Sequence, residues 1–366
     1  MSESSSMLLL GIGGAGAAIA RGVERAYGGG LRLLLVDTDA ASNTGDAPFA
    51  LVGGGRLAGR GAGGDIVAAR LAAEESVQVL DEHLEGIRLA VVVTALGGGT
   101  GGGTTLETIK HLGERGIPSL VFATTPFTFE GEDRQRNARG IMSMIEDAAN
   151  ATFFLPLDKL IADTDNMDEA LKRAVDTLAS GITLFWRMVE KPGYIRMDVE
   201  RIRRLLRNAG RGRFATATVQ GPDRAREAVD RICRSPLLAV GTNPVRAIVC
   251  GVLAGEDLRL SELAVVSESV QASFGGERRS FDLATVNDEQ TFTGRLALVV
   301  MLFESNGKDE PPPDQPGGFG RKRKRNAAAA VGTTGHNRFS NAEPTVWNGE
   351  DLDVPTFLRQ GISLDF

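Results

Sequence analysis

The sequence predicts an α/β protein. The expected architecture is a doubly wound parallel-sheet nucleotide-binding domain, a long central helix, a second, smaller α/β domain, and a disordered C-terminal linker ending in a short peptide. Short apolar runs such as residues 89–96 alternate with helix-like stretches, as in parallel sheets covered on both faces. Glycine-rich loops follow two of these runs, and regular apolar spacing stops after residue 304. The predicted segments are 1–170, 171–192, 193–304, 305–346 and 347–366.

The first glycine loop follows an apolar run at residues 7–10. It reads GIGGAG and opens a helix-like stretch, and Asp37 ends the next apolar run 21 positions after Gly16. This pattern matches the dinucleotide-binding fingerprint, whose acidic residue binds a ribose hydroxyl. A dinucleotide-dependent oxidoreductase is therefore one alternative function.

The second glycine loop, ALGGGTGGGTT at residues 95–105, contains six glycines. It lies between the apolar run 89–96 and a helix-like stretch, an arrangement that points backbone N–H groups at an anion. Two loops that converge on one ligand suit a triphosphate better than a bridging pyrophosphate. The candidate phosphate-binding residues are Gly13, Gly14, Gly16, Gly97, Gly98, Gly99, Thr100, Gly101 and Gly102.

A long helix is expected next, from Met167 to the Pro192-Gly193 stop, with Leu171 among its core residues. Four strand-like runs with intervening helices then predict the second α/β domain. The net charge of −6 argues against broad nucleic-acid binding. We find no leader peptide, long apolar run or metal-ligand spacing, and we expect Cys233 and Cys250 to be buried thiols.

The segment after residue 304 is rich in Pro, Gly and charge, so we expect it to be disordered. It contains a basic run from Arg321 to Arg325, which suits contact with an anionic membrane. Near the end, Asp353 can cap a short helix whose apolar stripe includes Phe357 and Leu358. Such a helix is marginal alone and is expected to fold into a partner's groove.

Several motifs together carry a family resemblance. GGGTGGG at residues 97–103 is one residue away from the tubulin signature GGGTG[ST]G. VDTDA (36–40), GRGAGG (59–64), TPFTFEG (125–131), KPGYIRMD (191–198) and DLDVPTFLRQ (351–360) accompany it in order. The chain resembles a divergent member of the tubulin/FtsZ family of GTPases over nearly its whole length.

The resemblance implies a GTP-binding cytoskeletal protein. Such a protein would polymerise head to tail into filaments for bacterial cell division and hydrolyse GTP in a site completed by a loop of the next subunit. GTP or GDP is the implied ligand, with Mg²⁺ as a further candidate. Its implied place is cytoplasmic, at the division site. Its implied partners are a second copy of itself and a membrane-linked division protein bound by the C-terminal peptide, with no specific nucleic acid.

The resemblance also assigns roles around the nucleotide. The segment with Gly61, Ala62 and Gly63 would close over the γ-phosphate. Glu130 would accept hydrogen bonds from the ribose, and Arg134 would lie near the phosphates or base. Asp176 would accept hydrogen bonds from the guanine edge. Leu157 stands where the family often has Asn.

The loop that completes the neighbouring site has the family pattern N-x-D-x-x-D. Here the matching residues run from Arg196 to Arg201 and keep only Asp198 of the three. A carboxylate is needed to orient the attacking water, so Asp198 and the nearby Glu200 are the catalytic candidates. We therefore expect nucleotide binding with slow hydrolysis. A weakly or non-hydrolysing paralogue that regulates or copolymerises with a true FtsZ is the second alternative.

Overall fold

The computed structural model describes residues 5–160, 166–207, 209–239, 243–275, 279–304, 346–347 and 350–351. The chain divides into two compact units, Met1–Glu310 and Pro311–Phe366. In the second unit, β11 (Val346–Trp347) pairs antiparallel with β12 (Glu350–Asp351). The predicted linker and terminal helix otherwise lie outside the described residues.

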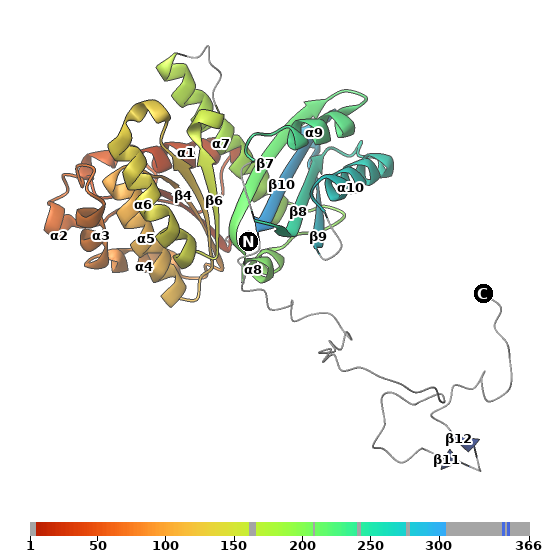
Figure 1. Ribbon diagram of the computed structural model, residues 1–366, viewed down its shortest axis with the longest axis horizontal. Coiled ribbons are helices and arrows are strands. Elements are labelled where there is room, and N and C mark those ends of the chain that lie inside the picture. Colours follow the sequence, from red (N-terminus) through yellow and green to blue (C-terminus); the bar gives the residue numbers. More distant parts are fainter. Residues whose placement is uncertain are drawn as a thin grey trace, which may run out of the picture. The chain divides into compact units, whose positions relative to one another are not determined.

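One ten-stranded sheet organises the first unit (Figure 1). Its order is β3-β2-β1-β4-β5-β6-β7-β10-β8-β9, and β10 is antiparallel to both of its neighbours while all other pairs are parallel. The strands are β1 (Met7–Ile12), β2 (Leu33–Asp37), β3 (Phe49–Leu51), β4 (Leu89–Ala95), β5 (Ser119–Thr125), β6 (Ala151–Pro156), β7 (Gly210–Gln220), β8 (Val245–Ala254), β9 (Ser280–Asn287) and β10 (Arg295–Glu304).

The helices connect these strands and cover both faces of the sheet. They are α1 (Gly13–Tyr27), α2 (Gly54–Leu57), α3 (Ile66–Glu74), α4 (Asp81–Leu84), α5 (Gly99–Glu114), α6 (Glu132–Ala148), α7 (Met167–Glu190), α8 (Val199–Leu206), α9 (Arg224–Cys233), α10 (Leu260–Phe274) and α11 (Glu289–Phe292). The predicted α/β class with a mostly parallel sheet is confirmed.

Strand β1 shows why the sheet is covered on both sides. All six of its residues are buried. Met7 and Leu9 belong to the core under α1 and α7, whereas Leu8 and Leu10 belong to the core under α5 and α6. Because side chains alternate along a strand, a strand that is apolar at every position needs a helical layer on each face. A third core packs α9 and α10 against the second half of the sheet.

Helix α7 confirms the predicted long helix. It begins at Met167 after the Asn166 side chain, which accepts a hydrogen bond from the N–H of Glu169, and it ends at Glu190 before Pro192. Its buried residues contact both halves of the sheet. The pairing of β6 with β7 makes the sheet continuous between the predicted domains, whose boundaries at 170 and 193 stay a prediction.

Two expectations about single residues are wrong. Cys250 is buried in β8 as expected, but Cys233 is exposed at the end of α9. Leu171 is 44% exposed rather than part of the core. Of the helices described here, none combines the length and the apolar character that crossing a membrane would require.

Candidate nucleotide-binding site

Two helices begin at the carboxyl edge of the sheet without side-chain caps. α1 starts directly after β1, α5 starts two residues after the β4–α5 turn at Gly97, and neither N-cap residue, Ile12 or Gly98, provides a capping side chain. Neither helix has an acidic residue in its first turn. The N–H groups of both first turns therefore remain available to an external acceptor, and both positive helix ends favour an anion.

Both helix ends line one cavity of about 350 Å³. This size falls in the usual range for small-molecule sites. Many of its lining residues come from the glycine loops, and the rest come from the ends of β5 and β6, from the turn before α6, and from α6 and α7. The lining residues are Ile12, Gly13, Gly14, Ala15, Ala95, Leu96, Gly98, Gly99, Thr100, Gly101, Thr124, Pro126, Glu130, Arg134, Leu157 and Leu171.

The predicted phosphate-binding glycines separate into two groups. Gly14 and Gly98 line the cavity, and an added Cβ on either would meet no atom within 4 Å. Gly16 and Gly102 do not line it. A Cβ on Gly16 would lie 2.4 Å from the carbonyl oxygen of Val93, so this glycine lets α1 pack against β4. The sequence pattern could not distinguish a packing glycine from a phosphate-contacting one.

Gly97 is also not among the residues that line the cavity. Its φ of 104° falls in the left-handed region, and an added Cβ would lie 3.2 Å from the carbonyl oxygen of Arg134. It therefore makes the turn that leads into α5. Thr100 does line the cavity, and its hydroxyl lies 2.6 Å from the hydroxyl of Thr38, which ties the second glycine loop to the end of β2.

The segment with Gly61, Ala62 and Gly63 lies beside the cavity but does not line it in this structure. A Cβ added to Gly99 would come within 2.9 Å of the Cβ of Ala62, which shows how close the segment approaches the start of α5. Asp65 ends the segment by capping α3.

Two charged side chains line the cavity, and they pair with each other. Arg134 forms an ion pair with Glu130, whose other carboxylate oxygen accepts a hydrogen bond from the N–H of Phe127 at 2.9 Å. Leu157 and Leu171 add apolar surface to the lining. Leu171 was missed as a site residue because its helical spacing indicated core packing, and Leu157 brings no polar group where the family pattern has Asn.

Two acidic residues singled out by motif do not reach the cavity. Asp176 is exposed on α7 and is not among the lining residues. Asp37, the ribose-binding candidate of a dinucleotide site, is 6% exposed and accepts a hydrogen bond from the N–H of Thr38 at 2.7 Å. Asp37 thus stabilises the turn after β2 rather than facing a ligand.

The predicted catalytic loop lies at the opposite edge of the sheet. Glu200 on α8 pairs with Arg88, which immediately precedes β4, at 2.6 Å. Just after α8, the N–H of Gly210 donates to the carbonyl of Asn150, at the start of β6. Both contacts are at the amino ends of the parallel strands, and Figure 1 shows α8 below them. Within one chain, Asp198 and Glu200 are therefore remote from the cavity.

The side chains of this loop have partners of their own. Asp198 caps α8 by accepting a hydrogen bond from the N–H of Arg201 at 2.8 Å. Glu200 also pairs with Arg203 at 3.0 Å. Arg201, at the position of the family's second carboxylate, donates its Nε–H to Asp282 of β9 at 2.7 Å. The loop is thus fastened to both halves of the sheet.

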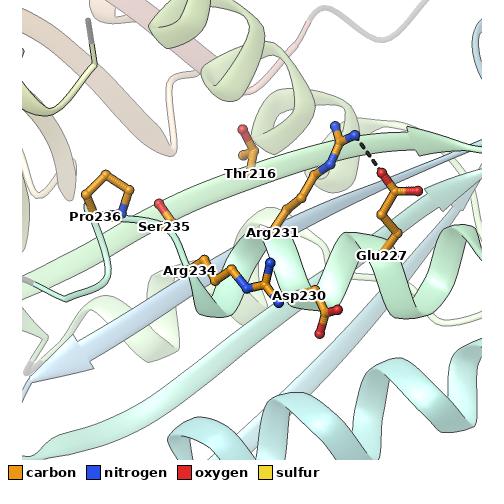
Figure 2. Close-up of a pocket in the computed structure, with 7 residues that line it drawn as sticks. All are labelled: Thr216, Glu227, Asp230, Arg231, Arg234, Ser235 and Pro236. Carbon is orange, nitrogen blue, oxygen red and sulfur yellow. Dashed lines mark hydrogen bonds and ion pairs between the residues drawn. The ribbon is translucent and has the colours of Figure 1, made fainter. Parts of the chain in front are cut away.

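Figure 2 shows a second cavity, of about 490 Å³, between β7 and α9. It is lined by Thr216, Glu227, Asp230, Arg231, Arg234, Ser235 and Pro236. Arg231 is paired with Glu227 at 2.6 Å, and no glycine loop or long-helix N-terminus contributes to the lining. It is therefore not the candidate nucleotide site.

The sequence comparisons agree with the geometry of the glycine-lined cavity. Residues 6–165 match the model of the Tubulin/FtsZ family, GTPase domain. Over 363 residues the chain is 29% identical to the cell division protein FtsZ of Pseudomonas putida, covering 98% of this chain and 89% of that protein. It is 26% identical to the cell division protein FtsZ of Pseudomonas aeruginosa over 365 residues, with 98% and 90% covered.

Solved structures share the fold. An empty FtsZ dimer of M. jannaschii superposes with a TM-score of 0.74 at 22% identity, covering 88% of this chain and 96% of that one. CetZ2 from Haloferax volcanii, in a GTPγS-bound protofilament, superposes with a TM-score of 0.68 at 20% identity, covering 81% and 92%.

Proposed function

We propose that the protein binds GTP and GDP in the glycine-lined cavity, a proposal supported by the match of residues 6–165 to the Tubulin/FtsZ family, GTPase domain. The observation that carries the proposal is the meeting of two uncapped helix N-termini, those of α1 and α5, in one cavity. Together they offer N–H groups to a chain of phosphates. If Mg²⁺ accompanies the nucleotide, the Thr100 hydroxyl in the cavity lining would be the protein's oxygen ligand for it and the metal would offset phosphate charge.

The same geometry disfavours a dinucleotide-dependent oxidoreductase. That function needs an acidic side chain at the ribose, and Asp37 is buried and engaged by its own turn. In the proposed complex Glu130 takes the ribose role, since it lines the cavity with one oxygen held by Arg134. Asp176 would need to approach the base from the exposed face of α7 to select guanine.

We further propose that copies of the chain assemble head to tail into filaments that serve bacterial cell division. The cavity and the loop with Asp198 lie at opposite edges of the sheet, so one copy can present its loop to the cavity of the next. Such a heterologous contact does not close and gives filaments. Assembly of this kind would place the protein in the cytoplasm at the division site, with its C-terminal peptide bound to a membrane-linked division protein and the basic run near anionic lipid.

GTP hydrolysis in this assembly would be slow. Asp198 and Glu200 are the carboxylates that the loop offers to an attacking water. Glu200 already pairs with Arg88 and Arg203, and both would have to release it before it could accept a proton. A paralogue that binds GTP and copolymerises with a true FtsZ, hydrolysing little, is the second candidate, and these ion pairs are the observation that favours it.

The test of nucleotide binding uses the open space above Gly14. Gly14 lines the cavity and a Cβ there meets nothing within 4 Å, so the side chain of Gly14→Leu can start into the cavity without a clash at its first carbon. We expect Gly14→Leu to lose GTP and GDP binding in titration calorimetry while keeping the wild-type unfolding midpoint. Gly140→Leu is the matched control, since Gly140 also has open space and lies on α6 away from the cavity lining.

The wild-type protein should bind GTP and GDP more tightly than ATP. Equal binding of GTP by wild type and Gly14→Leu would place the nucleotide elsewhere, and binding of NAD in preference to GTP would support the oxidoreductase instead. Sedimentation of the wild type with GTP, with GDP and without nucleotide, alongside phosphate release, tests assembly and hydrolysis.

A further inference from the structure

The lining of the cavity has no net charge to offer a triphosphate. Its charged side chains, Glu130 and Arg134, neutralise each other in an ion pair. The two helix ends contribute about half an elementary charge each. Even with the Mg²⁺ proposed above, a bound triphosphate therefore keeps a net negative charge, which a cation from outside the lining would stabilise.

The loop at the opposite edge of the sheet carries one arginine that is free to meet such a charge. In the pattern from residue 196 to residue 201, Asp198 caps α8, Glu200 has two arginine partners, and Arg201 is bound to Asp282. Arg196 is exposed and makes no hydrogen bond or ion pair to any residue that the structure describes.

The backbone around Arg196 is held on both sides. The N–H of Ile195 donates to the Thr285 hydroxyl at 2.8 Å, and the N–H of Thr285 donates to the carbonyl of Ile195 at 2.8 Å. On the other side, Met197 is 3% exposed, and Asp198 caps the next helix. The arginine is therefore presented on a fixed backbone, which lowers the entropy lost when its side chain binds a ligand.

Exposed apolar side chains identify what Arg196 would meet. Next to it, Tyr194 is 75% exposed and Ile195 is 41% exposed. At the cavity end, Leu171 in the lining is 44% exposed and Phe129, adjacent to Glu130, is 56% exposed. Exposed apolar side chains thus accompany both Arg196 and the cavity, which suits a contact between successive copies of the chain.

We propose that Arg196 of one copy binds the phosphates of the nucleotide held in the cavity of the next copy. This inference rests on the proposed function, namely GTP binding in the cavity and head-to-tail assembly. Arg196 supplies the missing positive charge, and its guanidinium fork can donate two parallel hydrogen bonds to phosphate oxygens. A guanidinium cannot accept a proton from water. The role of Arg196 is therefore to stabilise the junction between two copies when nucleotide is bound, rather than to activate the attacking water.

The experiment compares assembly with binding by the separate chain. We expect Arg196→Ala to raise the concentration needed for GTP-dependent sedimentation of the full chain by about tenfold or more. Arg196→Lys should retain part of the assembly, because it keeps the charge and loses the fork. GTP binding by dilute, unassembled protein should not change in either variant. Arg226→Ala removes the same charge from the exposed face of α9 and should assemble like wild type.

A mixing experiment tests whether the contact is between copies. Gly14→Leu has a blocked cavity and an intact loop, whereas Arg196→Ala has an intact cavity and a defective loop. Neither alone should form GTP-dependent complexes at wild-type concentrations. Their mixture should form heterodimers that sediment between the single chain and the wild-type polymer, since the loop of the first variant can enter the cavity of the second.

The outcomes separate the two proposals. If wild type binds no GTP, or does not assemble with it, the proposed function and this inference both fail. If wild type assembles but Arg196→Ala matches Arg226→Ala, the inference alone is wrong. It is also wrong if Arg196→Ala weakens GTP binding by the single chain, or if it leaves assembly unchanged and lowers binding to vesicles that contain an anionic phospholipid.

Discussion

Replacing Arg201 by Asp, which restores the family's carboxylate, should destabilise this protein. Arg201 is hydrogen-bonded to Asp282 through Nε, and the Asp282 side chain is 6% exposed. The second carboxylate oxygen of Asp282 has no hydrogen-bond partner among the described residues. Asp282 therefore depends on Arg201, and Arg201→Asp removes this cation and adds a like charge nearby.

The expected loss can be estimated in two parts. Removing one partner of a buried ion pair costs about 3–5 kcal/mol. The Arg201 side chain is 48% exposed, so water can partly replace it, and about 2–3 kcal/mol is the better expectation. A new carboxylate about 8 Å from Asp282 adds about 2 kcal/mol of repulsion at an effective dielectric constant of about 20, before screening by salt. The total is a large share of an ordinary folding free energy of about 5–15 kcal/mol.

Urea unfolding of four variants measures these parts at pH 7. Arg201→Ala should show the first loss alone, Arg201→Asp should be less stable still, and added salt should narrow the gap between them. Asp282→Asn in the Arg201→Asp background should restore stability, because it removes the unpaired charge. Phosphate release should then be compared between Arg201→Asp/Asp282→Asn and Asp282→Asn alone, with the higher rate in the double variant. Equal stability of Arg201→Ala and Arg201→Asp, or no recovery in the double variant, would refute this reasoning.

Three further predictions concern other parts of the chain. The buried Arg224 guanidinium donates hydrogen bonds to the Glu262 carboxyl and lowers its pKa. The ionised Glu262 therefore stabilises the fold above its unfolded pKa of about 4.3, and this stabilisation is lost as the pH falls through the lower folded pKa. In urea unfolding, Glu262→Gln should lower the free energy of unfolding by about 1.5–3 kcal/mol at pH 7, and its difference from wild type should shrink below about pH 4. Burial raises the pKa of the Cys250 thiol to about 12. Iodoacetamide at pH 8 should therefore modify the exposed Cys233 quickly and Cys250 only in urea. Rapid modification of both thiols without urea would contradict the burial of Cys250. Removal of residues 351–366 should leave GTP binding and sedimentation unchanged and abolish recruitment to the division site, and loss of sedimentation would instead assign those residues to the polymer contact.

Local patterns predicted the elements well, because each depends on residues close in sequence. The apolar run 89–96 became β4, and helical spacing placed α7 within a residue of its observed end. The two glycine loops were expected to converge on one ligand, and both helix ends do line one cavity.

Roles that depend on distant partners could not be predicted in this way. The glycine pattern treats Gly14 and Gly16 alike, but only the position of β4 shows that Gly16 is a packing residue. The sequence offers Glu200 as a free carboxylate, whereas Arg88, more than a hundred residues earlier, pairs with it. Leu171 fits the apolar stripe of α7, yet it is 44% exposed and lies in the lining of the cavity.

Because the cavity and the loop lie at opposite edges of one chain, the number of completed nucleotide sites in a filament differs from the number of chains. In a row of copies joined loop to cavity, the terminal copy at one end has a loop that enters no cavity. The terminal copy at the other end has a cavity that no loop enters. A row therefore contains one fewer completed site than it has chains, and a pair has a single completed site. The two tips differ chemically, one presenting arginine and tyrosine and the other presenting a nucleotide, so growth and loss of chains should proceed at different rates at each tip.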